Sequence, residues 1–148
     1  MLSVYLSGEI HTDWREQIIE GAKGLDVEFS APVTDHGASD DCGVKILGAE
    51  DDKYWHDHKG AMVNAIRTRK GIEEADVVVV RFGDKYKQWN AAFDAGYASA
   101  MGKSLIILQP PEHDHALKEV DAAALAVTRE PGQVVDILRY VLEGTLPK

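Results

Sequence analysis

Cysteine is almost absent from this chain, since Cys42 is the only one in 148 residues. No disulfide can form within the chain, and we expect a reducing, cytoplasmic environment. Cys42 directly follows Asp40 and Asp41. Nearby negative charge opposes formation of a thiolate, so Cys42 is not favoured as a nucleophile.

Long hydrophobic segments are also absent. The longest strongly apolar runs, at residues 77–80 and 105–108, are far too short to span a bilayer. The N-terminal sequence MLSVYLSGEI has neither the basic start nor the long apolar stretch of a signal peptide. We therefore expect no membrane partner.

Basic residues are outnumbered: Lys and Arg total 16 against 25 Asp and Glu, which gives a net charge of −9. Broad binding to nucleic acid requires a basic surface, so we expect no nucleic-acid partner. The glycine-rich patterns GxGxxG and GxxxxGKS/T are missing as well, and dinucleotide-binding and P-loop functions lose their main support. A small anionic ligand held by a few arginines remains compatible with this composition.

The hydrophobic pattern alternates between short apolar runs and segments with helical periodicity. Residues 77–80 are all valine, which is typical of a strand buried on both faces. The region from Val33 to Tyr54 is polar and turn-rich, and its length favours a functional loop. The pattern predicts strands at residues 2–6, 27–30, 75–80, 104–108 and 122–127, and helices at 13–23, 60–73, 89–101 and 133–142.

This alternation predicts one α/β domain over residues 1–148. Right-handed crossovers favour a flavodoxin-like, doubly wound sheet of five parallel strands in the order 2-1-3-4-5, with helices on both faces. In such sheets the ligand crevice lies beyond the carboxyl ends of the strands, beside the switch point. The turns at residues 7–15 and 81–94 are expected at that edge.

The first turn, residues 5–15, is dense in groups that hold small ligands. Gly8 permits a close backbone approach, and the N–H groups at the start of the next helix favour an anion. Arg15 can bind a phosphate or carboxylate through two hydrogen bonds. A tight turn with a surface arginine is the alternative, but the place at the switch point favours ligand binding.

The second turn, residues 81–90, contributes aromatic rings. Phe82, Tyr86 and Trp89 are each able to stack on a planar base. Trp89 has a second interpretation, because it begins an apolar stripe at helical spacing that is equally typical of a core. The stripe consists of Trp89, Ala92, Phe93, Gly96, Tyr97 and Ala100.

Asp94 lies in the early turns of the helix predicted at residues 89–101, off that apolar stripe. The helix dipole lowers a carboxylate pKa there, so we expect Asp94 to be ionised. Spacing alone favours a helix-end acid without chemistry. Its place beside the switch point leaves a nucleophile or a ligand-binding group as alternatives.

Three stretches, residues 5–15, 72–80 and 91–108, resemble the nucleoside 2-deoxyribosyltransferase superfamily and, within it, the YtoQ family. Their motifs are a Tyr-x-x-Gly turn, IxxADVVV, and AxxxGYAxAxGK. In that superfamily a glutamate two residues before the Gly-Tyr-Ala attacks the anomeric carbon of a nucleoside, and Asp94 occupies this position. The resemblance implies a covalent glycosyl–enzyme, resolved by water or a second base, and a homodimer or larger homo-oligomer whose partner chain completes the site.

The chain departs from the family pattern in three places. Aspartate is one methylene shorter than glutamate. Gln88 stands six residues before Asp94, where the transferases carry a carboxylate, and the basic run at residues 67–70 replaces another. The extra basic groups suit a phosphorylated ligand. No inherited acid protonates the leaving base, and the substitutes are Glu9, His11, Asp57 and Asp84.

We therefore expect an enzyme that cleaves or exchanges the N-glycosidic bond of a nucleoside or nucleotide, with Asp94 as the catalytic nucleophile and no cofactor. A non-catalytic nucleotide-binding or sensing module is the alternative. The residues expected to bind the substrate are Tyr5, Ser7, Gly8, Glu9, Ile10, His11, Trp14, Arg15, Asp57, Arg69, Phe82, Gly83, Trp89 and Asn90.

Two His-Asp-His triplets, at residues 56–58 and 113–115, allow a third hypothesis, a metal-dependent hydrolase. Neither triplet has the spacing of a known zinc motif or a full ligand set, so we expect no metal. The second triplet is expected in a solvated loop. The first, together with Tyr54 and Trp55, is placed to close over the pocket from the long loop.

Overall fold

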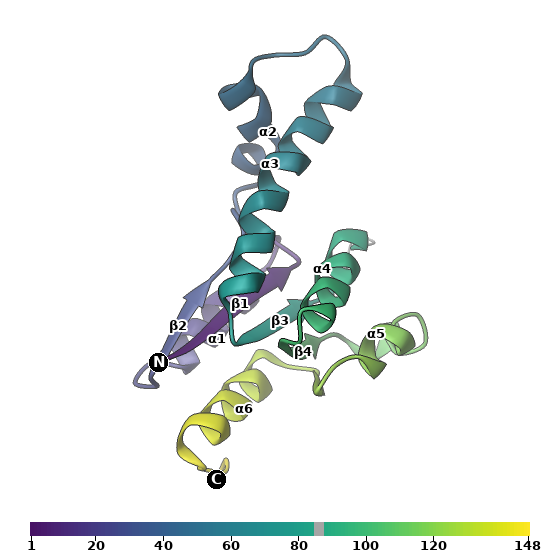
Figure 1. Cartoon of the computed structure of the whole chain (residues 1–148). Coiled ribbons are helices and arrows are strands. Elements are labelled where there is room, and N and C mark those ends of the chain that lie inside the picture. The colour runs from purple at the N-terminus through teal and green to yellow at the C-terminus, as the bar shows by residue number, and fades with distance from the viewer. Residues whose placement is uncertain (85–87) are drawn as a thin grey trace.

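The computed structural model describes residues 1–84 and 88–148, which form one sheet of five parallel strands (Figure 1). The strand order is β2-β1-β3-β4-β5, which confirms the predicted flavodoxin-like topology. Each end of the predicted strands shifts by only a few residues, except at the last one. The strands are β1 (Leu2–Gly8), β2 (Val27–Ser30), β3 (Val77–Arg81), β4 (Ser104–Leu108) and β5 (Ala126–Thr128).

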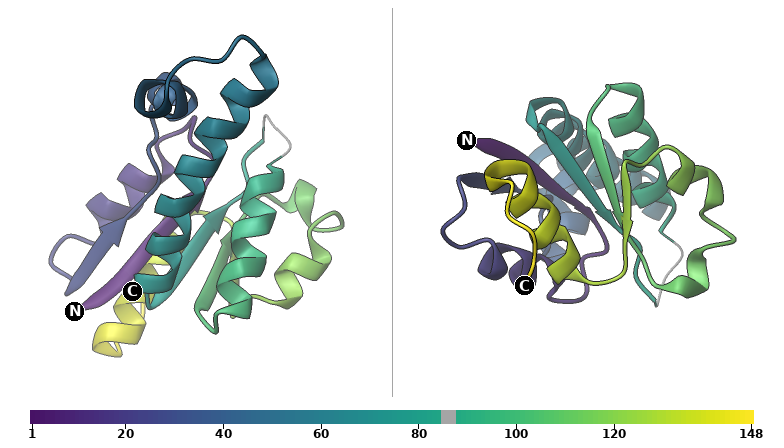
Figure 2. Two further views of the ribbon diagram at one scale, coloured as in Figure 1. Left: turned by 45° about the horizontal axis from the view of Figure 1, so that its top comes forward. Right: turned by 90° about the horizontal axis from the view of Figure 1, so that it is seen from below.

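The helices cover both faces of this sheet (Figure 2). Helices α1 (Trp14–Gly21) and α6 (Pro131–Glu143) lie on one face, and α3 (Lys53–Glu74) and α4 (Trp89–Ala100) lie on the other. A single 3-10 turn, η1 (Pro111–His113), and helix α5 (Lys118–Ala122) precede β5. The strand predicted at residues 122–127 was therefore placed too early, because α5 takes its beginning.

The central strands explain why two cores form. Along β3, Val77 and Val79 pack in the core under α1 and α6, while Val78 and Val80 pack in the core under α3 and α4. Successive side chains of a strand point to opposite faces, so an unbroken valine run fills both layers. Within the described residues, no helix is both long enough and apolar enough to cross a membrane.

Helix α4 is buried through small residues, contrary to the predicted aromatic stripe. Ala91, Ala95 and Ala98 are at most 3% exposed, whereas Trp89 is 73% and Phe93 61% exposed. The alanines recur at the i, i+4, i+7 spacing of one helix face. The helix packs on the alanine stripe, so the interpretation of Trp89 as the start of a core stripe was wrong.

The polar segment from Val33 to Tyr54 is mostly helical, which corrects the expectation of a loop. It contains α2 (His36–Leu47) and the start of α3, and the outer parts of both helices project beyond the sheet (Figure 1). The two helices meet backbone to backbone: a Cβ added to Gly43 would lie 2.5 Å from the nitrogen of Gly60. Asp35 caps α2 by accepting from the Ala38 N–H at 2.7 Å.

Candidate active site

A cavity of about 770 Å³ lies beyond the carboxyl ends of β1 and β3. Four parts of the chain line it: the turn after β1, residues 32–33 after β2, the segment that begins α4, and the facing sides of α2 and α3. This is the switch-point crevice that the topology predicts. Of the expected site residues, those that line the cavity are Gly8, Glu9, Ile10, His11, Trp89, Asn90 and Asp94.

Gly8 brings β1 against the end of β3. It has a φ of +106°, and a Cβ at this position would lie 2.2 Å from the carbonyl oxygen of Arg81. The next residue continues this contact, because the Glu9 N–H donates to the same carbonyl at 3.1 Å. The close approach predicted for Gly8 is therefore to the protein's own backbone.

The Glu9 side chain organises the rest of the turn. Its carboxylate accepts hydrogen bonds from the backbone N–H of His11 and, at 2.6 Å, from the hydroxyl of Thr12. Glu9 is only 5% exposed although it borders the cavity. Its carboxylate is thus occupied in shaping the turn that presents His11.

The side chains of Arg15 and Trp14 hold this turn in place through hydrogen bonds to its backbone carbonyls. The Arg15 guanidinium donates to the carbonyls of Leu6 at 2.9 Å, Glu9 at 2.6 Å and Gly8 at 3.2 Å. Burial lowers its pKa to about 10. Trp14 is buried under it and donates to the Glu9 carbonyl at 2.8 Å. Neither residue lines the cavity, so the expected phosphate contact of Arg15 and the expected substrate contact of Trp14 are replaced by structural roles.

Asp94 reaches the cavity from the second turn of α4. The Ser7 hydroxyl, at the end of β1, donates to Asp94 Oδ2 at 2.6 Å. Within residues 1–84 and 88–148, Asp94 Oδ1 accepts no hydrogen bond. Burial raises the pKa of Asp94 above its ordinary value, and the Ser7 hydrogen bond offsets part of this shift. The expected lowering by the helix dipole was wrong, because desolvation outweighs it.

Tyr5 lies behind Asp94, in the core under α3 and α4. Its ring fills the space that a Cβ on Gly71 would need, 2.3 Å from Tyr5 Cε2. The hydroxyl is buried near Thr68 but makes no hydrogen bond of standard geometry. Burial raises the pKa of Tyr5, and the Asp94 carboxylate raises it further. Tyr5 therefore contributes to the apolar backing of the carboxylate.

The turn after β3 contributes polar groups and one exposed ring. Phe82 is buried in the core, so it cannot stack on a ligand as expected, and Tyr86 lies outside the described residues. Trp89 borders the cavity and keeps its expected stacking role as a prediction. Gly83 is also buried, and its N–H donates to the side-chain oxygen of Gln88 at 2.7 Å.

The part of the cavity wall formed by α2 and α3 was not predicted from the sequence. From α2 it includes His36 and Asp40, whose side chains pair at 3.1 Å. From α3 it includes Asn64, which donates to the Ser39 carbonyl at 2.9 Å. The ring of His36 lies 5.7 Å from that of His11, between centroids. The polar character of the segment at residues 33–54 was the available signal.

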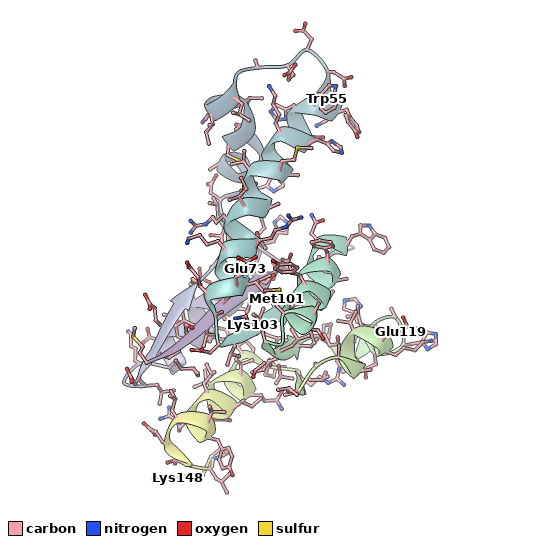
Figure 3. All side chains as sticks on the ribbon, viewed as in Figure 1. Trp55, Glu73, Met101, Lys103, Glu119 and Lys148 are labelled. Carbon is pink, nitrogen blue, oxygen red and sulfur yellow. The ribbon has the colours of Figure 1, made fainter. Side chains whose placement is uncertain are left out.

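Three expected site residues lie elsewhere. Asp57 is exposed and pairs with Lys53 on the outer part of α3, where Figure 3 labels Trp55. Residues 54–58, which were expected to close over the pocket, are not among the described residues that line the cavity. Arg69 is exposed and does not line the cavity; from the run at residues 67–70 it is Thr68 that does. Asp84 lines a neighbouring cavity of about 340 Å³.

The second His-Asp-His triplet lies at the end of η1 and in the turn after it, and Asp114 and His115 are exposed, as expected of a solvated loop. Hydrogen bonds nevertheless hold two of its side chains. His113 Nε2 donates to the Gly83 carbonyl at 2.8 Å. Asp114 accepts two hydrogen bonds from Arg129, which hold the pKa of Asp114 below its ordinary value. In the first triplet, His56 contacts Asp57 and also Asp41 of α2.

The fold and the cavity together define the class of protein: a flavodoxin-like sheet with a half-buried carboxylate at its switch point, which accepts a hydrogen bond from a serine hydroxyl. The family model for the nucleoside 2-deoxyribosyltransferase YtoQ matches residues 5–142. The uncharacterized protein YtoQ of Bacillus subtilis (strain 168) is 42% identical over 142 residues, covering 95% of this chain and 96% of that protein. The chain therefore belongs to the YtoQ family of nucleoside 2-deoxyribosyltransferases.

Solved structures share this fold at low sequence identity. A conserved protein from Enterococcus faecalis V583 has a TM-score of 0.61 at 14% identity, over 96% of this chain and 99% of that one. The 2-deoxyribosyltransferase of Bacillus psychrosaccharolyticus has a TM-score of 0.58 at 14% identity, over 90% of each chain. The CMP N-glycosidase BcmB of Clostridium botulinum has a TM-score of 0.51 at 15% identity, over 92% of this chain and 97% of that one.

Proposed function

We propose that this protein cleaves or exchanges the N-glycosidic bond of a nucleoside or nucleotide, with Asp94 as the nucleophile. One observation carries the proposal: Asp94 borders the cavity with Oδ2 held by Ser7, which leaves Oδ1 to react. Family membership and the two glycosyl-handling enzymes of the same fold support this class of chemistry.

In the proposed reaction, Asp94 Oδ1 attacks the anomeric carbon of the sugar. The carbon–oxygen bond forms as the carbon–nitrogen bond breaks, and the base leaves with the bonding electrons. Water or a second base then attacks the same carbon, which releases the carboxylate. A partly buried carboxylate suits this role, because its raised pKa increases its basicity.

The leaving base needs a proton, and the structure ranks the expected donors. Asp57 and Asp84 do not line the cavity, and the Glu9 carboxylate already accepts two hydrogen bonds. His11 is the expected donor that remains at the cavity, and it is the group we assign to this step.

The test uses a panel of deoxynucleosides and nucleoside 5′-monophosphates, with release of free base followed by chromatography. We expect release by the wild type and none by Asp94→Ala. Glu119→Ala removes an exposed carboxylate on α5, outside the cavity, and serves as the matched control. Release that persists in Asp94→Ala would remove Asp94 from the mechanism. Tight binding without release by the wild type would establish the alternative, a nucleotide-binding or sensing module.

We also propose a cytoplasmic homodimer or larger homo-oligomer. Helices α3 and α4 expose Met62, Ile66 and Phe93, each at least 61% accessible, on the side that faces away from the sheet. Exposed apolar groups of this kind are typical of interfaces. Light scattering after size exclusion should give a multiple of the 16.3 kDa chain mass, reduced by Phe93→Lys. Leu125→Lys, which replaces an exposed leucine next to β5, should leave the mass unchanged. A monomeric wild type would contradict this assembly.

A further inference from the structure

Gln88 holds its side-chain amide in one orientation at the cavity. It directly precedes α4, borders the cavity, and accepts a hydrogen bond from the Gly83 N–H at 2.7 Å. A backbone N–H can only donate, so the amide atom that faces it must be the oxygen. The NH₂ group is therefore the other end of the amide. The Gln88 side chain makes no further hydrogen bond within the described residues.

The partner of Gln88 is itself fixed, so the amide cannot easily turn over. The Gly83 carbonyl accepts from His113 at 2.8 Å, and the preceding Phe82 N–H donates to the Leu108 carbonyl at 2.9 Å. A Cβ on Gly83 would lie 2.6 Å from Glu9 Cγ and 3.2 Å from Gln88 Nε2. If the amide turned over, its NH₂ group would face the Gly83 N–H, and neither donor would have an acceptor.

Three other polar side chains of the cavity wall, those of Asn64, Glu9 and Asp40, differ from Gln88 in this respect. The amide of Asn64 already donates to the carbonyl and hydroxyl of Ser39. Glu9 and Asp40 present carboxylates, which are acceptors when ionised. Gln88 thus brings to the cavity wall an amide whose NH₂ group has no hydrogen-bond partner within the described residues.

We propose that Gln88 selects heterocycles that present an oxo group to the cavity over those that present an amino group. This inference rests on the proposed nucleoside or nucleotide site. Oxo and amino groups at one position of a base are an acceptor and a donor of similar size. An oxo group pairs with the Gln88 NH₂, whereas an amino group places donor against donor and leaves both without a partner.

The experiment measures the Kd of matched ligands by calorimetry, with Asp94→Ala added to every protein, including the one called wild type, so that no ligand is cleaved during the titration. The pairs are deoxyuridine with deoxycytidine and deoxyinosine with deoxyadenosine, each as nucleoside and 5′-monophosphate. We expect the wild type to bind the oxo member at least about tenfold more tightly. Gln88→Glu keeps an oxygen for the Gly83 N–H and replaces the NH₂ by an acceptor, so the preference should vanish or invert. Gln88→Met, which adds no charge, should bring each pair within about threefold.

Gln133→Glu is the matched control. The Gln133 oxygen likewise accepts from a backbone N–H, that of Arg129 at 2.7 Å, but at the start of α6 and outside the cavity. This variant should keep the wild-type preference. Equal or amino-favouring binding by the wild type, or an unchanged preference in Gln88→Glu, would overturn the assignment. Binding with the oxo preference but without base release would sustain it while refuting the reaction. No binding of any ligand would refute the proposed site and, with it, this role of Gln88.

Discussion

Replacing Gly8 by alanine tests whether the contact between β1 and β3 holds the site together. Two costs add at this position. A φ of +106° is unfavourable for any residue with a Cβ, by about 1–2 kcal/mol. The new Cβ would also lie 2.2 Å from the Arg81 carbonyl oxygen, and relieving such overpacking costs about 1–3 kcal/mol. We expect Gly8→Ala to lower the free energy of unfolding by about 2–5 kcal/mol.

Gly48→Ala separates the two costs. Gly48 has a similar φ of +93°, but nothing lies within 4 Å of an added Cβ. Urea unfolding should therefore show a loss of only about 1–2 kcal/mol for this variant. Equal losses in the two variants would refute the reasoning, because they would show that the approach to Arg81 is not tight in solution.

Three further outcomes are expected. Burial raises the folded-state pKa of Asp94 above 3.8, so the protonated carboxyl stabilises the fold, and this stabilisation is lost as pH rises through the folded pKa. Asp94→Asn does not titrate, so its free energy of unfolding in urea should rise relative to that of the wild type over this pH range. A difference that does not change with pH would contradict the burial of Asp94. Ser7→Ala removes the hydrogen bond that favours the carboxylate, so the acidic limb of the rate profile for base release should move to higher pH; an unmoved limb would exclude this role of Ser7. Gly43→Ala should lower the free energy of unfolding in urea by about 1–3 kcal/mol, because its Cβ would lie 2.5 Å from the backbone of Gly60. Gly37→Ala, whose added Cβ has its nearest neighbour at 3.6 Å, should be close to neutral. Equal effects would show that α2 and α3 are not closely packed.

The strands were predictable because their signal is local. The valines of β3 and the apolar run of β4 need burial on both faces, and few folds of this length provide it. Strand order and the switch-point crevice follow from crossover handedness. Asp94 and the turn after β1 could be placed at the crevice for the same reason.

The rest depends on contacts between distant segments. Helix α2 contains two glycines and two aspartates, yet it forms because it packs against α3 and is capped by Asp35. Its contribution to the cavity depends on the same packing, so the polar composition of residues 33–54 alone did not predict it. Arg15 shows a similar limit: the sequence offers a guanidinium, but only the fold supplies the three carbonyls that occupy it.

The alanine face of α4 determines how far the Asp94 carboxylate must reach from its helix. The separation of packed elements is set by the side chains between them, so a helix that lies on Ala91, Ala95 and Ala98 sits nearer to the strands than one that lies on larger side chains. An aspartate falls short of a glutamate by one carbon–carbon bond, about 1.5 Å. The small residues of α4 shorten the path from its backbone to Ser7, and the Asp94 carboxylate spans it with a hydrogen bond of 2.6 Å. Larger side chains at these positions would move α4, and with it the Asp94 carboxylate, away from the strands. Residues that do not contact a ligand therefore determine the position of Asp94, the residue that we propose as the nucleophile.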